Sequence, residues 1–229
     1  IAPTTLLARQ HMQTFSARFK DLPVVVRELS RLVSSKDSAQ TRAGLAEGEV
    51  DIVIGTHALL SKNISFKRIG LVVVDEEQHF GVAHKERLKN LRNEVHVLTL
   101  TATPIPRTLQ MAMTGVRDLS IIATPPVDRL AVRTYVSPFD RVSLREALLR
   151  EKYRAGQSFI IVPRISDITE ITDFLSEDVP EVRFITAHGQ MSGGDLEERM
   201  TAFYLGTYDV LVSTSIIESG LDIPSVNTI

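Results

Sequence analysis

Two adjacent carboxylates, Asp75 and Glu76, follow an apolar run at residues 71–74. Four consecutive branched apolar residues predict a central parallel strand that is buried on both faces. Ligands of open α/β sheets bind just beyond the carboxyl ends of such strands. Two acids there suit a hydrated Mg²⁺ on a nucleotide phosphate, with the second acid orienting the attacking water. The alternative is a strand that runs into a solvated acidic turn, and these residues alone leave both interpretations open.

Composition excludes several classes of protein. The chain has 229 residues, 43% of them apolar and 24% charged, and can bury one large core or two small ones. It contains no apolar run of the ~18 residues that a membrane span needs, no secretory signal and no cysteine. We therefore expect a cytoplasmic protein without a membrane partner. Because 26 basic and 28 acidic residues give a net charge of −2, nucleic acid must bind through a local patch, backbone amides or hydroxyls.

Strand and helix patterns alternate along the chain, which predicts βα units and parallel sheets. In the first half, strands are expected at residues 24–29, 52–54, 71–74, 95–100 and 119–123, and helices at 5–19, 37–47 and after Pro106 to about 113. In the second half, strands are expected at residues 130–136, 159–162, 182–186 and 210–212, and helices at 140–155, 167–175 and 196–204. Gly48 is expected to end the second helix and Asp167 to cap a later one.

The elements divide into two lobes. Residues 124–128 contain two prolines, which stiffen the chain and end a strand, and are the expected linker. We expect an α/β fold with one lobe at residues 1–127 and another at 128–229, and a cleft where their strand ends face each other. Both ends of the sequence look cut inside a strand, at residues 1–3 and 226–229, so the chain is expected to be an excised fragment.

Five short sequences at expected strand ends resemble, in order, the motifs of superfamily 2 helicases and translocases. They are residues 2–10 (motif Ia), 55–57 (motif Ib), 75–78 (motif II), 101–103 (motif III) and 213–224 (motif V). The resemblance implies two RecA-like parallel-sheet lobes of the P-loop NTPase type, both truncated. The first would be the helicase ATP-binding domain and the second the helicase C-terminal domain.

Longer stretches narrow the resemblance to the branch that holds RecG and the bacterial transcription-repair coupling factors. Residues 75–82, 99–109 and 188–191 resemble both, whereas 84–89 and 111–126 look closer to the coupling factors. That resemblance implies ATP-driven translocation on double-stranded DNA, displacement of stalled RNA polymerase and recruitment of an excision-repair protein. Both protein partners would bind regions outside these residues. The alternatives are a RecG-type branched-DNA helicase and a non-catalytic nucleic-acid-binding module with two lobes.

The resemblance also assigns roles around ATP and Mg²⁺. Asp75 would hold Mg²⁺ through water, and Glu76 would polarise the hydrolytic water. Gln78, where relatives more often have His, would relay a hydrogen bond towards the motif III hydroxyls, which either transmit lobe closure or simply cap a helix. The remaining residues expected at the nucleotide or in its coupling to closure are Thr101, Thr103, Arg107, Gly220 and Asp222.

Other motif residues would contact DNA phosphates through hydroxyls and the amides at helix starts. They are Pro3, Thr4, Thr5, Arg9, Thr56, His57, His188, Gly189, Ser213 and Thr214. Arg9 lies on a helix whose apolar stripe is predicted by the spacing of Leu7, His11, Phe15 and Phe19. A solvated helix face for Arg9 and a structural role for His57 are the alternatives.

The glycine-rich loop that cradles phosphates, Gly-x-x-x-x-Gly-Lys-Ser/Thr, does not occur in this sequence. In the family it lies upstream of Ile1, and the arginine-bearing motif VI lies downstream of Ile229. We therefore expect the fragment not to hydrolyse ATP, although its parent does. The first sheet would also lack the strand between 95–100 and 119–123, so that this lobe is distorted or borrows a strand.

Overall fold

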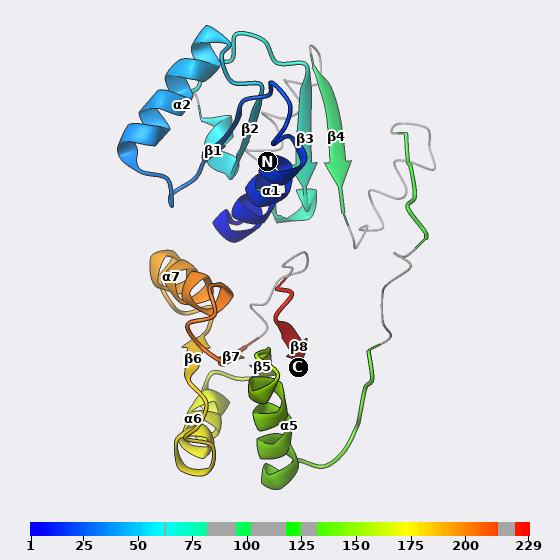
Figure 1. Ribbon diagram of the computed structural model, residues 1–229, viewed down its shortest axis with the longest axis vertical. Helices are drawn as coiled ribbons and strands as arrows, with labels where there is room; N and C mark the ends of the chain where they lie inside the picture. The colour runs from blue at the N-terminus through cyan, green and yellow to red at the C-terminus, as the bar shows by residue number, and fades with distance from the viewer. Residues whose placement is uncertain (62, 82–94, 102–117, 125–131, 215–222) are drawn as a thin grey trace.

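The computed structural model describes residues 1–61, 63–81, 95–101, 118–124, 132–214 and 223–229. Within them the chain forms two RecA-like lobes with parallel sheets, drawn at the top and the bottom of Figure 1. No helix in this described part is long and apolar enough to cross a membrane. The expected α/β fold is confirmed.

The first lobe has helices on a sheet that is built from two strand pairs. Its helices are α1 (Thr5–Arg18) and α2 (Ser35–Glu47), with short 3-10 helices η1 (His57–Leu60) and η2 (Glu77–His79). Its strands are β1 (Val26–Leu29), β2 (Ile52–Gly55), β3 (Leu71–Asp75) and β4 (His96–Leu100). β1 pairs with β2 and β3 with β4, both in parallel.

Ile1 and Ala2 connect the two strand pairs. The nitrogen of Ile1 donates to the carbonyl of Val73 at 2.6 Å, and the amide of Asp75 donates to the carbonyl of Ile1 at 2.9 Å. On the other side, the amide of Ala2 donates to the carbonyl of Gly55 at 2.9 Å. The beginning of the chain therefore lies between β2 and β3, although residues 1–3 form no strand.

Local capping signals fix the ends of these helices. The hydroxyl of Thr4 accepts a hydrogen bond from the amide of Leu7 at 3.2 Å and so begins α1. Ser34 caps α2 through the amide of Asp37, and Gly48 ends it with a left-handed backbone, at φ 78°. A residue with a Cβ is strained in that conformation, which explains the glycine that the sequence placed there.

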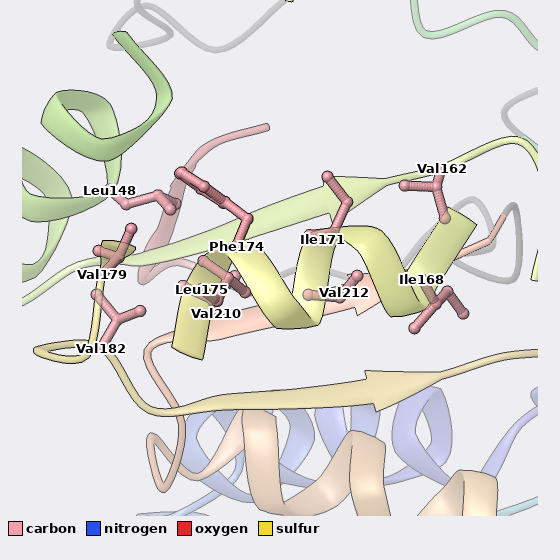
Figure 2. Packing of buried hydrophobic residues seen from close by; sticks show 10 residues of the cluster. All are labelled: Leu148, Val162, Ile168, Ile171, Phe174, Leu175, Val179, Val182, Val210 and Val212. Atoms are coloured by element: carbon pink, nitrogen blue, oxygen red, sulfur yellow. The ribbon is translucent and has the colours of Figure 1, made fainter. Parts of the chain in front are cut away.

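The second lobe has one continuous parallel sheet in the strand order β6-β7-β5-β8. Its strands are β5 (Gln157–Ile161), β6 (Phe184–Ala187), β7 (Val210–Ser213) and β8 (Val226–Thr228), and its helices are α5 (Arg141–Tyr153), α6 (Ser166–Asp178) and α7 (Gly193–Tyr204). Figure 2 shows the apolar face of α6 over this sheet, where Leu175 lies beside Val210 of β7 in one buried cluster. That cluster contains ten buried residues.

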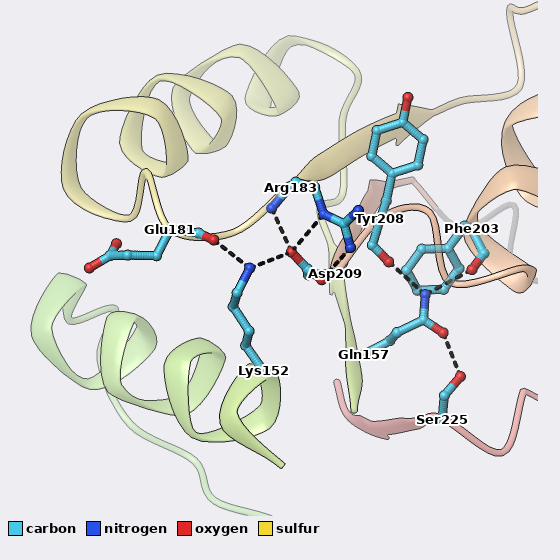
Figure 3. A network of polar contacts seen from close by, with 8 residues as sticks. All are labelled: Lys152, Gln157, Glu181, Arg183, Phe203, Tyr208, Asp209 and Ser225. Carbon is cyan, nitrogen blue, oxygen red and sulfur yellow. Dashed lines mark hydrogen bonds and ion pairs between the residues drawn. The ribbon is translucent and has the colours of Figure 1, made fainter. Parts of the chain in front are cut away.

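A polar network ties the loops of the second lobe together (Figure 3). Lys152 on α5 donates to the Asp209 carboxylate at 2.9 Å, and Arg183 contacts the same carboxylate through its backbone amide at 2.8 Å and its guanidinium at 3.1 Å. Burial opposes the ionisation of Asp209, but the hydrogen bonds from Arg183 and Lys152 outweigh it and lower its pKa to about 2. The network holds α5 and the beginnings of β6 and β7 together.

The expected strand at 119–123 is wrong, and so is the described part, 132–136, of the strand expected at 130–136. Residues 118–124 and 132–140 contain no strand, and Ile122 and Val136 are 96% and 98% exposed. β-branched residues form a stable strand only beside a strand with which they can pair. None of the described strands lies next to these segments, since β4 pairs only with β3 and β5 only with β7 and β8.

The other elements expected within the described residues are present within a few residues of their predicted bounds. The expected cap at Asp167 is wrong, because α6 begins after Ile165 without a side-chain cap. Asp167 lies in the first turn instead, where Arg164 donates to its carboxylate at 3.1 Å. The helix expected after Pro106 and most of the expected linker lie outside the described residues.

Candidate functional site

The candidate site lies where β3 ends beside β4. Val74 is fully buried, Asp75 closes the strand opposite Leu100, and the amide of Glu76 donates to the Leu100 carbonyl at 3.0 Å. The two acids are therefore adjacent to the end of β4, after which Thr101 follows in the chain. The strand ends β3 and β4 point towards the second lobe in Figure 1.

Glu76 is held in an unusual conformation. Its φ is 50°, in the left-handed region that non-glycine residues rarely adopt. The residue is also buried, with only 3% of its surface exposed. The Gln78 amide donates to the Glu76 carboxylate, and the amide of His79 donates to the Glu76 carbonyl at 3.0 Å. A strained backbone at a buried acid is a common feature of functional sites. A solvated acidic turn does not describe this residue.

Asp75 has a partner that the sequence did not identify. The Nε2 atom of His11, on α1, lies 2.8 Å from Oδ2 of Asp75. The hydrogen bond from His11 is the main reason that the pKa of Asp75 lies below its ordinary value, so this carboxylate is charged at neutral pH. The helical spacing placed His11 on the buried stripe of α1, but no local signal could connect it to an acid 64 residues away.

These acids fit a nucleotide-bound Mg²⁺ better than a metal held by protein alone. Among the described residues, no group of three or more His, Cys, Asp or Glu side chains could hold a metal ion. Mg²⁺ on a nucleotide usually needs only one or two carboxylates, because phosphates and waters supply the other oxygens. An ionised Asp75 with a 20% exposed side chain meets that requirement.

The predicted DNA-contacting residues of the first lobe lie at two helix starts. Pro3 and Thr4 precede α1 and are half-buried, whereas Thr5 is only 4% exposed and can offer its backbone amide more readily than its hydroxyl. Arg9 is half-buried on the same helix. At the end of β2, Thr56 is buried and His57 is exposed at the beginning of η1.

The predicted phosphate contacts of the second lobe lie at the ends of neighbouring strands. Ala187 of β6 is opposite Ser213 of β7, so His188 and Thr214 follow at the same edge of the sheet. Gly189 is exposed there and Thr214 is half-buried. In the described part of the chain, Nδ1 of His188 and Oγ of Ser213 are buried without a hydrogen-bond partner. Such atoms are rare in folded proteins and call for a ligand or water.

The nucleotide-coupling residues are only partly described. Thr101 is exposed after β4, while Thr103, Arg107, Gly220 and Asp222 lie outside the described residues. The contact found for Gln78 is with Glu76. Its expected relay to the motif III hydroxyls therefore stays a prediction.

The two lobes touch through α1 and α7. The hydroxyl of Tyr204 donates to the side-chain oxygen of Gln13 at 3.0 Å. Arg31, after β1, forms an ion pair of 2.8 Å with Glu197. Helix α1 therefore contacts both the acid at the end of β3 and the second lobe.

Comparison with known proteins gives two family matches. The DEAD/DEAH box helicase family matches residues 1–112, and the helicase conserved C-terminal domain matches residues 141–229. The expected boundary between 127 and 128 falls in the unmatched interval and stays a prediction.

Curated relatives match the entire chain. Transcription-repair-coupling factors of Rickettsia bellii, Escherichia coli and Bacillus subtilis are 53%, 52% and 51% identical to it over 228 or 229 residues, which is 100% of this chain and 20% of each relative. The chain thus spans about a fifth of the length of the curated relatives it matches.

Solved structures agree on the fold. RecG bound to a three-way DNA junction has a TM-score of 0.78 and 35% identity, over 99% of this chain and 30% of that one. Saccharomyces cerevisiae Dbp5 bound to RNA and ADP BeF3 has a TM-score of 0.64 and 18% identity, over 99% of this chain and 59% of that one. The second likeness shows the fold alone.

Proposed function

Because the chain belongs to the helicases that join a DEAD/DEAH box domain to a conserved C-terminal helicase domain, we propose that the full-length protein is an ATP-dependent translocase on double-stranded DNA. The observation that carries the proposal is the pair of acids at the end of β3. Asp75 is ionised and partly accessible, while Glu76 is buried and oriented by Gln78.

The two acids have different tasks in this proposal. Mg²⁺, when bound with ATP, supplies positive charge that neutralises the phosphates. Asp75 would hold that ion through water with its charged carboxylate. Glu76 accepts a hydrogen bond from the attacking water and orients it, because its carboxylate is fixed by the Gln78 amide and by the tight turn that follows β3.

Backbone amides and hydroxyls hold the DNA in this proposal. Those at the start of α1 and after β6 and β7 would contact phosphates, which suits a chain with a net charge of −2. The likeness to RecG on a DNA junction supports a duplex substrate. The nucleotide-coupling roles of Thr101, Thr103, Arg107, Gly220 and Asp222 are proposed with it.

The cellular task we propose is that of a coupling factor, which displaces stalled RNA polymerase and recruits excision repair in the cytoplasm. The identity of 51–53% to coupling factors, against 35% to RecG, favours this task over regression of branched DNA. Polymerase and repair-protein contacts are assigned to parts of the full-length protein beyond these residues. Displacement of a stalled polymerase, measured beside fork regression, separates the two candidates.

A single substitution tests the chemistry. In the full-length protein, Glu76→Gln should lower duplex-DNA-stimulated ATP hydrolysis at least ~100-fold, since a group that activates the attacking water contributes about that much or more. Glu77→Gln removes the same charge from the next residue and is the matched control. Hydrolysis by Glu76→Gln at a rate close to that of the control would refute the role of Glu76.

The 229 residues alone contain no phosphate-binding loop, so we propose that they do not hydrolyse ATP by themselves. Phosphate release by the isolated chain, measured with duplex DNA, should not exceed the background of the assay. Release that DNA stimulates would contradict this proposal.

A further inference from the structure

We propose that His11 is a positioning residue that fixes the Asp75 carboxylate and links it mechanically to helix α1. The inference rests on the proposed role of Asp75. It adds His11 to the residues that act on the bound nucleotide, and His11 lies outside all five motifs. It starts from one measured contact, the 2.8 Å between Nε2 of His11 and Oδ2 of Asp75.

The geometry shows why Asp75 needs a partner. The terminal torsion of an aspartate side chain is broad, so its carboxylate plane is poorly fixed by the rotamer alone. The backbone of Asp75 is held on both sides, by Ile1 and through its pairing with Leu100. A hydrogen bond from His11 therefore fixes the remaining freedom of this side chain. Removal of residues from the outer shell of a metal site typically changes metal affinity about 10–100-fold.

His11 is well placed to hold the carboxylate. Its helix is anchored one turn earlier by Leu7 and Ala8, which are 4% and 0% exposed and belong to the cluster with Ile54 of β2. The side chains of His11 and Asp75 are 35% and 20% exposed, so the contact is partly shielded from water. Because fewer water molecules compete for these polar atoms, the hydrogen bond is stronger than one on the open surface.

Helix α1 also carries the proposed DNA-contacting amides and a hydrogen bond to the second lobe. Its first turn offers the amides that follow Thr4, and Gln13, two residues after His11, accepts from Tyr204 of α7. Hydrogen bonds weaken steeply with misalignment. A shift of α1 caused by DNA or by lobe movement therefore changes how firmly His11 holds Asp75. The contact couples these events to the metal-holding carboxylate.

The alternative is a histidine that only fills space on the apolar face of α1. Phenylalanine and glutamine separate the two roles. His11→Phe keeps a ring of similar size but has no N–H, whereas His11→Gln keeps a side-chain N–H donor with less ring packing. If His11 only fills space, His11→Phe should preserve function better than His11→Gln. If His11 positions Asp75, His11→Gln should preserve function better than His11→Phe.

The experiment measures the Mg²⁺ concentration that gives half-maximal binding of a fluorescent ATP analogue to the full-length protein, together with kcat and KM for duplex-DNA-stimulated hydrolysis. His11→Phe should raise that Mg²⁺ concentration about tenfold, whereas His11→Gln should stay within about threefold of the native protein. His96→Phe is the matched control, because His96 is exposed and lies opposite Leu71 at the far end of the β3–β4 pair.

Equal Mg²⁺ dependence of His11→Phe and His96→Phe would overturn the inference, as would equal losses in His11→Phe and His11→Gln. Failure of the proposed function gives a different result. In that case the native protein shows no DNA-stimulated hydrolysis, or Glu76→Gln hydrolyses ATP normally. If hydrolysis by the native protein is lost in Glu76→Gln but His11→Phe leaves the Mg²⁺ dependence unchanged, only the role of His11 is refuted.

Discussion

The two lobes share a fold class but differ in how their sheets are held together. The second lobe has four parallel strands in one sheet, with one cluster of ten buried residues and another of four in its described part. The sheet of the first lobe consists of two strand pairs joined by backbone hydrogen bonds of Ile1 and Ala2, over two clusters of four buried residues each. The candidate chemistry lies in the less continuous lobe.

This difference indicates that the two lobes differ in rigidity. Elements that must respond to ligands are drawn from the less stable parts of proteins, where fewer apolar contacts hold the backbone. Asp75 and Glu76 lie at the end of a strand whose other neighbour is only the start of the chain. In the proposed translocase, the continuous sheet of the second lobe would make it the rigid body against which the first lobe moves.

The largest expected effect on stability is in the second lobe. Glu151 on α5 is 2% exposed and accepts hydrogen bonds from Arg154, Asn227 and Thr228, which fasten β8 to the helix. Burial opposes its ionisation, but these donors lower its pKa overall. Because hydrogen bonds to a charged group contribute about 1.5–3 kcal/mol, Glu151→Ala should lower the free energy of unfolding of this lobe by about 2–3 kcal/mol.

Lobe-resolved hydrogen exchange checks that prediction. Protection should fall in β5 and β8 and remain in β3 and β4. Glu146→Ala, which removes an exposed acid from the same helix, is the control and should change the unfolding free energy by less than about 0.5 kcal/mol. Equal losses in the two variants would show that the buried acid does not fasten β8.

Acid should weaken the second lobe through Asp209. A carboxylate whose pKa is about 2 when folded and 3.8 when unfolded stabilises the folded state above pH 4. About 2 kcal/mol of stability should then be lost as the pH falls from ~4 to ~2. Urea unfolding across this range should show that loss in the native chain and much less in Asp209→Asn. Asp173→Asn, an exposed change on α6, should behave like the native chain.

A smaller effect is expected in the first lobe at Gly55. A Cβ at this position would lie 2.2 Å from the carbonyl oxygen of Leu29, so β1 and β2 would have to separate. Gly55→Ala should cost about 1–2 kcal/mol of unfolding free energy in this lobe. Gly70→Ala meets no atom within 4 Å and is the control. Loss of hydrogen-exchange protection in β5 instead of β1 and β2 would contradict the expectation that this substitution destabilises only the first lobe.

Much of the fold could be predicted from local signals. Gly48, the alternating strands and the apolar run before Asp75 were sufficient for the order of most elements. The expected burial of β3 on both faces was wrong in part, since Val72 and Val74 are buried but Leu71 is 57% exposed. The strands expected at residues 119–123 and 132–136 were wrong because their composition favours a strand, whereas pairing depends on neighbours that the local pattern does not contain. Asp167 failed as a cap because α6 already begins at Ser166, which places Asp167 within the first turn, where it accepts from Arg164.

The candidate site was predictable in part for the same reason. Asp75, Glu76 and Gln78 form one short sequence at a strand end, so their proximity follows from the chain itself. His11 joins them only through the packing of α1 beside β3, a contact between residues far apart in sequence. The spacing on α1 predicted that His11 faces inward but could not name its partner. The buried Glu151 and Asp209 networks were missed for this reason too.

The most direct test of the central claim is a single-turnover measurement on the full-length protein with duplex DNA, in which bound ATP is followed to ADP and phosphate. If Glu76 orients the attacking water, Glu76→Gln should bind ATP with Mg²⁺ as tightly as the native protein and leave it uncleaved for at least ~100 times longer. Cleavage of the bound ATP at the native rate would contradict the assignment of these acids to ATP hydrolysis.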